Sequence, residues 1–131
     1  MFSLANLAIV FVGAGIGGML RFSLNILAAR VAGFADFPWG TFVINITGSL
    51  VMGFVAAWLI FRVQEPWSGQ TRLFAMTGIL GGYTTFSAFS LEAYLLIERG
   101  KWLLATAYAG GSVVIGIAAL AAGFVVVRSV S

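Results

Sequence analysis

The chain has 131 residues, of which 61% are hydrophobic and only 8% are charged, and its formal net charge is +3. Since a soluble domain averages about 25% charged residues, this composition is typical of an integral membrane protein, and the length allows one domain, residues 1–131. The sequence contains no cysteine and no histidine, which removes thiol chemistry and the usual general base, so we expect neither an enzyme nor a nucleic-acid partner for the few scattered basic residues.

Four segments are apolar enough to cross a lipid bilayer as helices, which takes roughly 20 residues each. They run from about Leu4 to Ala29, Trp39 to Phe61, Leu73 to Ile97 and Trp102 to Val127. The first segment lacks the basic region and cleavage site of a signal peptide, so we interpret it as a span. Trp58, Trp67 and Trp102 fall near span ends, as an aromatic belt would place them. The predicted fold is therefore an all-α integral membrane protein with four transmembrane helices per subunit.

The basic residues near the span ends are divided evenly between the two sides of the membrane. Arg62, Arg72 and Arg128 fall on the side of the termini, and Arg30, Arg99 and Lys101 fall on the other. Because Lys and Arg in short loops set orientation, an even balance allows insertion both ways and hence an antiparallel homodimer. A single topology, dominated by one loop charge, is the alternative that the count leaves open.

Small residues recur along the spans and permit close contacts between helices. Gly13 and Gly17 form a GxxxG pattern in the first span, and further glycines follow in the later spans. These later positions are Gly48, Gly53, Gly110, Gly111, Gly116 and Gly123. The pattern predicts packing, either within one subunit or between subunits.

Arg21 lies inside the first predicted span, where a charge at the bilayer centre costs about 2.5 kcal/mol or more. It comes late in that span, so its side chain can extend to the interface. One interpretation is an anchor, or a partner for backbone carbonyls or Glu92. The other is that Arg21 faces a water-filled vestibule and attracts anions.

Polar residues recur on one face of the second span and again on one face of the fourth. The second span carries Thr41, Asn45 and Ser49, and the fourth carries Tyr108 and Ser112, with Gly116 next in register. A spacing of four residues keeps each set on a single helix face. Contacts between helices explain either stripe alone, whereas two stripes favour a water-lined path.

The third predicted span contains the stretch "GGYTTFSAFS", Gly81 to Ser90, which is unfavourable for a continuous helix. Gly81 and Gly82 weaken a helix, and the following threonine hydroxyls compete for backbone hydrogen bonds. A break in mid-membrane frees carbonyl oxygens, which are ligands for Na⁺. Phe86 and Phe89 share a face. They are either core or lipid contacts, or they turn their partially positive ring edges toward an anion path.

These residues together resemble a known family. The stretch "GGYTTFSAFS", the stretch "GTFVINITGSLVMG" at residues 40–53, and Arg21 after "GAGIGG" closely resemble the Fluc/CrcB family of fluoride ion channels. The resemblance implies an antiparallel, dual-topology homodimer of four-span subunits with two fluoride pores. It implies passive efflux of cytoplasmic fluoride across the bacterial plasma (inner) membrane, which reduces fluoride toxicity.

The resemblance also implies roles for individual residues. The backbone carbonyls of Gly81 and Thr84, from both subunits, would hold a structural Na⁺ at the dimer interface. The fluoride pore would be lined by Phe86, Phe89, Asn45, Ser87, Tyr108 and Ser112, with support from Arg21, Thr41 and Glu92.

The sequence departs from the family pattern at three positions. Ala88 replaces the second threonine of the usual "TTFSTFS", Gly116 stands where the hydroxyl track would often continue, and Tyr83 replaces an aliphatic residue. The first two departures each remove a hydroxyl from the outer pore. The alternative class is a four-span, dual-topology small multidrug-type transporter, which usually needs an acidic residue in its first span, and this first span has none. A membrane subunit without transport is a further alternative, against which the two polar stripes argue.

Overall fold

The computed structural model of the protein describes residues 2–63 and 68–131, and within them all regular structure is helical. Helices α1 (Leu4–Ala32), α2 (Trp39–Phe61) and α6 (Trp102–Ser129) are long and apolar enough to cross a membrane. Between α2 and α6 the chain forms a third helical path, which consists of α3 (Ser68–Arg72), the π-helix η1 (Leu73–Leu80), α4 (Gly81–Tyr83) and α5 (Phe86–Glu98). The four predicted helical segments are therefore present. Trp67 lies outside the described residues.

The observed helix ends follow from local backbone chemistry. Helix α1 continues past the predicted end at Ala29 and stops at Ala32, because Gly33 takes a positive φ of 61° and donates its N–H to the carbonyl of Ala29. Helix α5 ends before Gly100, whose φ is 72°. At the other end of the chain, Ser3 caps α1 by accepting the N–H of Asn6 at 3.1 Å.

The third helical path is interrupted at two residues. Thr84 has a ψ of 158° and Thr85 has φ −150° and ψ 118°, so both have extended backbone between α4 and α5. The prediction attributed the interruption to Gly81 and Gly82 together with the hydroxyls of the threonines that follow. The part about the glycines was wrong, because both are helical, and the extended residues are the two threonines. Gly82 serves a different purpose: a Cβ there would lie 2.5 Å from the carbonyl oxygen of Ala14 in α1, so only glycine allows this contact.

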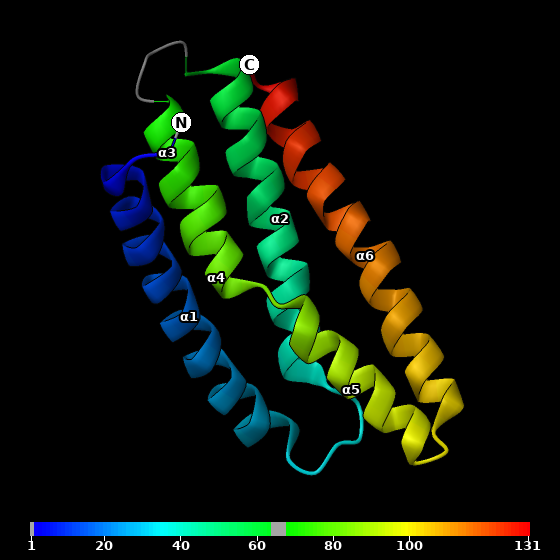
Figure 1. The fold of residues 1–131 in the computed structure, drawn as a ribbon. Helices are drawn as coiled ribbons and strands as arrows, with labels where there is room; N and C mark the ends of the chain where they lie inside the picture. Colours follow the sequence, from blue (N-terminus) through cyan, green and yellow to red (C-terminus); the bar gives the residue numbers. More distant parts are fainter. Residues whose placement is uncertain (1, 64–67) are drawn as a thin grey trace.

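The interruption redirects the third path from one side of the bundle to the other. Figure 1 shows η1 and α4 alongside α1, whereas α5 runs toward α6. Helix α2 lies between them and packs most extensively on α6. Both termini lie at one end of the molecule, and the α1–α2 and α5–α6 connections lie at the other. The two sets of basic residues therefore occupy opposite ends, as the sequence indicated.

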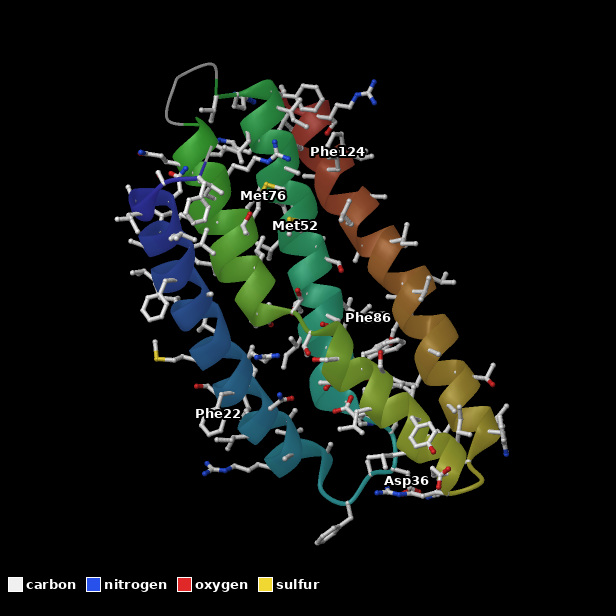
Figure 2. All side chains as sticks on the ribbon, in the orientation of Figure 1. Phe22, Asp36, Met52, Met76, Phe86 and Phe124 are labelled. Atoms are coloured by element: carbon white, nitrogen blue, oxygen red, sulfur yellow. The ribbon has the colours of Figure 1, made fainter. Side chains whose placement is uncertain are left out.

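The connections at the second end are fastened to each other by an ion pair between Asp36 and Lys101. A hydrogen bond and the charge of Lys101 lower the pKa of the Asp36 carboxyl below its usual value. Figure 2 shows Asp36 at this end of the molecule.

Close helix packing is the observed role of several of the predicted glycines. A Cβ on Gly13 would lie 2.8 Å from the carbonyl oxygen of Phe74, and a Cβ on Gly17 would lie 2.7 Å from the amide nitrogen of Tyr83. Gly123 of α6 meets the backbone of α2 in the same way. The GxxxG pattern thus mediates packing within one subunit, between α1 and the first half of the third path.

The fully buried side chains mark where the core lies. Tyr108 and Ile44 are the largest of them, and Tyr108 belongs to a cluster with Leu96 and Ala105. Phe37, Phe42 and Phe89 pack against this cluster. The core is therefore concentrated between α2, α5 and α6, next to the interruption.

Replacing Gly17 by alanine should destabilise the protein by about 1–3 kcal/mol, because the new methyl group meets backbone atoms that cannot move independently. Gly15→Ala is the matched control: a Cβ at Gly15 meets nothing within 4 Å, and alanine is the better helix former. Thermal unfolding of both variants in detergent measures the difference. Equal midpoints would show that the Gly17 contact is not needed.

Candidate functional site

One side chain from α2 forms hydrogen bonds with the interrupted backbone between α4 and α5. The amide nitrogen Nδ2 of Asn45 donates to the carbonyl of Thr85 at 3.0 Å, and the N–H of Thr85 donates to Oδ1 of Asn45 at 2.9 Å. Thr85 is buried, with 7% of its surface exposed. The side chain of Asn45 thus satisfies both backbone groups of a residue that has left the helix, as a neighbouring strand would.

The two threonine hydroxyls satisfy the helix ends on either side of the interruption. Thr84 donates its hydroxyl to the carbonyl of Leu80 at 2.9 Å, and its own N–H also donates to that carbonyl, at 3.0 Å. The hydroxyl of Thr85 accepts the N–H of Ala88 at 3.2 Å and so caps the start of α5. One threonine hydroxyl thus bonds to the last turn of the helix before the interruption, and the other bonds to the first turn of the helix after it.

These hydrogen bonds leave particular carbonyl groups without their usual donors. In a continuous α-helix the carbonyl of Gly81 accepts the N–H of Thr85, and the carbonyl of Thr84 accepts the N–H of Ala88. Here those two N–H groups donate to the side chains of Asn45 and Thr85. The carbonyls of Gly81 and Thr84 are the two that the family resemblance implies as Na⁺ ligands. Residues 2–63 and 68–131 hold no cluster of three or more His, Cys, Asp or Glu side chains that could hold a metal ion.

Aromatic side chains continue from the interruption toward the core. Phe86 is 79% exposed at the start of α5 and its ring centroid lies 5.6 Å from that of Phe89. The ring of Phe89 lies 5.1 Å from that of Tyr108 on α6. Figure 2 shows Phe86 where α5 begins, next to the interruption. The structure therefore brings Phe86, Phe89 and Tyr108 into one line, from an exposed end to a buried end.

The buried end of this line meets a hydrogen-bonded group of three polar side chains. Glu92 of α5 accepts the hydroxyl of Thr41 at 2.8 Å and the hydroxyl of Tyr108 at 2.7 Å, one on each carboxylate oxygen. Thr41 and Tyr108 are both buried. The predicted alternative in which Arg21 contacts Glu92 does not hold among the described residues, because the Glu92 carboxylate is occupied by these two hydroxyls and Arg21 forms no ion pair there.

Ser112 and Ser87 complete the predicted set. The hydroxyl oxygen of Ser112 is buried and has no hydrogen-bond partner in the described part of the chain, which is uncommon for a buried polar atom. The hydroxyl of Ser87 lies 3.4 Å from that of Thr85. A groove of about 330 Å³ has Asn45, Ser49, Thr84, Thr85 and Phe86 among its lining residues.

Comparison with known proteins identifies the family. The family described as CrcB-like protein, Camphor Resistance (CrcB), matches residues 8–124. A protein of Methylobacterium sp. (strain 4-46) named fluoride-specific ion channel FluC is 53% identical over 123 residues, which cover 94% of this chain and 96% of that protein. A Nitrobacter hamburgensis protein named fluoride-specific ion channel FluC 2 is 53% identical over 125 residues (94% of this chain and 97% of the relative). The Rhodopseudomonas palustris (strain BisB5) protein named fluoride-specific ion channel FluC is 51% identical over 123 residues, with 94% and 97% covered. The chain belongs to the CrcB-like family.

One contact of this CrcB-like chain was missed by the sequence reasoning. The hydroxyls of Tyr83 and Thr47 lie 2.8 Å apart and join the end of α4 to α2. Thr47 already donates its single proton within its own helix, to Val43 at 2.7 Å, so Tyr83 is the donor. The departure from an aliphatic residue at Tyr83 was the available signal, but nothing in the sequence indicated its partner.

Replacing Asn45 by leucine keeps the volume but leaves the N–H and C=O of Thr85 without partners. An unsatisfied buried polar group costs about 1–3 kcal/mol, so we expect a loss of stability of about 2–6 kcal/mol for the two. Ser49→Ala, one turn further along the same helix face, is the control and should change stability little. The unfolding midpoint and the exchange rate of the Thr85 amide proton report the effect. Unchanged exchange at Thr85 in Asn45→Leu would contradict it.

Proposed function

We propose that this chain forms a fluoride channel through which cytoplasmic fluoride leaves the cell passively, so that fluoride toxicity is reduced. The observation that carries the proposal is the match to relatives named fluoride-specific ion channels, at 50–53% identity over more than nine-tenths of the chain. Three apolar helices and the third helical path suit a multi-pass protein of the bacterial plasma membrane. The same match leaves the multidrug-transporter alternative without support.

The proposed path is built from groups that stabilise an anion without a fixed positive charge. The ring edges of Phe86 and Phe89 carry partial positive charge, and the hydroxyl of Ser112 is a buried donor that no acceptor in the described residues uses. The amide of Asn45 has two N–H groups, of which one donates to Thr85, so the second remains for an ion in the groove. Neutral donors bind weakly enough for an ion to leave again, which conduction requires.

The driving force for this channel is the membrane potential. Fluoride enters a cell as neutral HF and dissociates at cytoplasmic pH. A potential that is negative inside then favours the exit of the anion by about 2.3 kcal/mol per 100 mV. The channel needs no bound nucleotide and no catalytic group for this process.

A second copy of the chain is the proposed partner. The aromatic line begins at the exposed ring of Phe86, and the groove beside it is open, so a single chain leaves the path without one wall. The even division of basic residues between the two ends suits insertion in both orientations. We therefore infer an antiparallel homodimer with the interruption of the third helix at mid-membrane.

The proposed dimer also explains the carbonyls of Gly81 and Thr84. Two such carbonyls from each of two chains supply four oxygen ligands of the kind that hold Na⁺ at broken membrane helices. A bound Na⁺ would supply positive charge that draws the two interrupted backbones together. Asn45 leaves the carbonyl of Gly81 available by accepting the N–H of Thr85, and the hydroxyl of Thr85 leaves the carbonyl of Thr84 available by accepting the N–H of Ala88.

Purified protein in liposomes should release fluoride when an ionophore allows compensating K⁺ movement, and it should release chloride far more slowly. Phe86→Ile and Phe89→Ile should each reduce fluoride flux about tenfold or more, because isoleucine keeps apolar bulk but removes the ring edge. Size-exclusion chromatography checks that the dimer remains.

Phe124→Ile is the matched control, because that ring lies 5.7 Å from the ring of Phe61, toward the end of the bundle that holds the termini and away from Phe86. It should conduct normally. Equal fluoride and chloride release by the unmodified protein would overturn the proposed function. Near-normal flux in both Ile variants, with intact dimers, would remove only the role of the rings.

A further inference from the structure

A separate cavity lies at the end of the molecule that holds the α1–α2 connection. Its volume is about 220 Å³, and its walls come from α1, residues 33–38, the start of α2 and one residue of α5. Most of the residues that line it are alanine, glycine or aromatic. The polar groups of its lining side chains belong to Asn25, Thr41 and Glu92, together with the indole N–H of Trp39.

The cavity begins where the line of candidate path residues ends. Thr41 and Glu92 are hydrogen-bonded to each other at 2.8 Å, and Tyr108 donates to the same carboxylate. Phe37, which also lines the cavity, meets the ring of Tyr108 edge-on with centroids 5.5 Å apart. An ion that passes Tyr108 therefore has this cavity directly ahead of it, with Phe37 between the two.

The size and the lining groups of the cavity suit an anion that is being rehydrated as it leaves the path. A water molecule occupies about 30 Å³ of liquid, so the cavity holds several. The carboxylate of Glu92 repels an anion here, and both of its oxygens are already taken by hydroxyls. Asn25 supplies two N–H donors without a charge, and the indole N–H of Trp39 is a further uncharged donor among the residues that line the cavity.

The side chain of Asn25 lies against the opposite wall of the cavity. A Cβ on Gly40 would lie 2.5 Å from Oδ1 of Asn25, so the side chain of Asn25 rests against the backbone of α2 where glycine makes room for it. Asn25 and Gly40 thus form a matched pair across the cavity, on α1 and α2.

We propose that this cavity is one mouth of the ion path and that the side-chain amide of Asn25 donates hydrogen bonds to the anion as it passes Glu92. The proposal rests on the proposed fluoride function and extends it to a residue of α1 that the sequence reasoning did not select. Fluoride is the ion expected, and water in the cavity completes its coordination.

The test is fluoride efflux from liposomes that contain Asn25→Leu, Asn25→Asp or Gly40→Ala. Leucine keeps the size but removes both donors, and aspartate keeps the shape but adds a charge of the same sign as the ion. We expect flux to fall about tenfold in the leucine variant and further in the aspartate variant. Gly40→Ala should lower flux as well, because the new methyl group displaces Asn25.

Phe34→Asp is the matched control. Phe34 is fully exposed on the same connection and does not line the cavity, and a single Asp has little influence on membrane orientation. This variant adds the same charge at the same end, and its flux should stay within about twofold of the unmodified protein. Dimer formation is checked for every variant by size-exclusion chromatography.

The possible results distinguish a failure of the proposed mouth from a failure of the proposed fluoride function. Low fluoride flux in the Asn25 variants, together with normal flux in Phe34→Asp, supports the proposal that this cavity is a mouth of the ion path. Normal flux in Asn25→Leu and Asn25→Asp, or an equal loss in Phe34→Asp, overturns it while the fluoride channel stands. If the Asn25 variants do not form dimers, the flux of Gly40→Ala decides, since it leaves Asn25 itself in place. Absence of fluoride flux in the unmodified protein refutes the proposed function instead.

Discussion

The pairing of the Asn45 side chain with the backbone of Thr85 is the interaction on which the rest of this structure depends. A membrane offers no water to a backbone group that has left its helix, so an interruption survives only where protein atoms replace the lost partners. Asn45 replaces both of them, at 2.9 and 3.0 Å. With that amide in place, the third path can move from the side of α1 to the side of α6 (Figure 1).

The same interruption accounts for the two kinds of ion proposed here. Its backbone presents the carbonyls of Gly81 and Thr84, whose helical donors are engaged by side chains, and these suit a cation. The side chains that follow it, beginning with Phe86, suit an anion through ring edges and hydroxyls. One local feature thus separates the two charges, because backbone oxygens carry negative partial charge and the ring edges and hydroxyl protons carry positive partial charge.

The sequence predicts the helices well because the bilayer imposes a length of about 20 apolar residues on each span. The limits of α2 are the predicted ones, and those of α1 and α6 differ by a few residues. The site of the interruption was predicted within a few residues, but only part of the predicted reason was right. The threonine hydroxyls do bond to backbone groups, as expected. Glycine was also expected to weaken the helix, whereas Gly82 makes room for α1, and this contact is visible only once α1 is placed beside it.

The polar contacts of the candidate site could be predicted only in part. The periodicity of α2 selects Thr41 and Asn45, but it does not say that Thr41 meets Glu92, which lies 51 residues away in the sequence. The cavity beside Asn25 was not predictable either, because its walls come from three helices and a connection. The periodicity of polar and apolar residues shows which residues lie on the same face of one helix. It carries no information on which helices contact each other.

The central claim is that two antiparallel chains meet at the interruption, and cross-linking of single cysteines tests it most directly. The sequence has no cysteine, so the background is clean, and a Cβ at Gly81 meets only the carbonyl of Met76, at an ordinary 3.5 Å. Gly81→Cys in membranes should give a cross-linked dimer with a short bifunctional thiol reagent. Phe34→Cys should not, because in antiparallel chains the two copies lie on opposite faces of the membrane. Cross-linking at Phe34 without cross-linking at Gly81 would contradict the account.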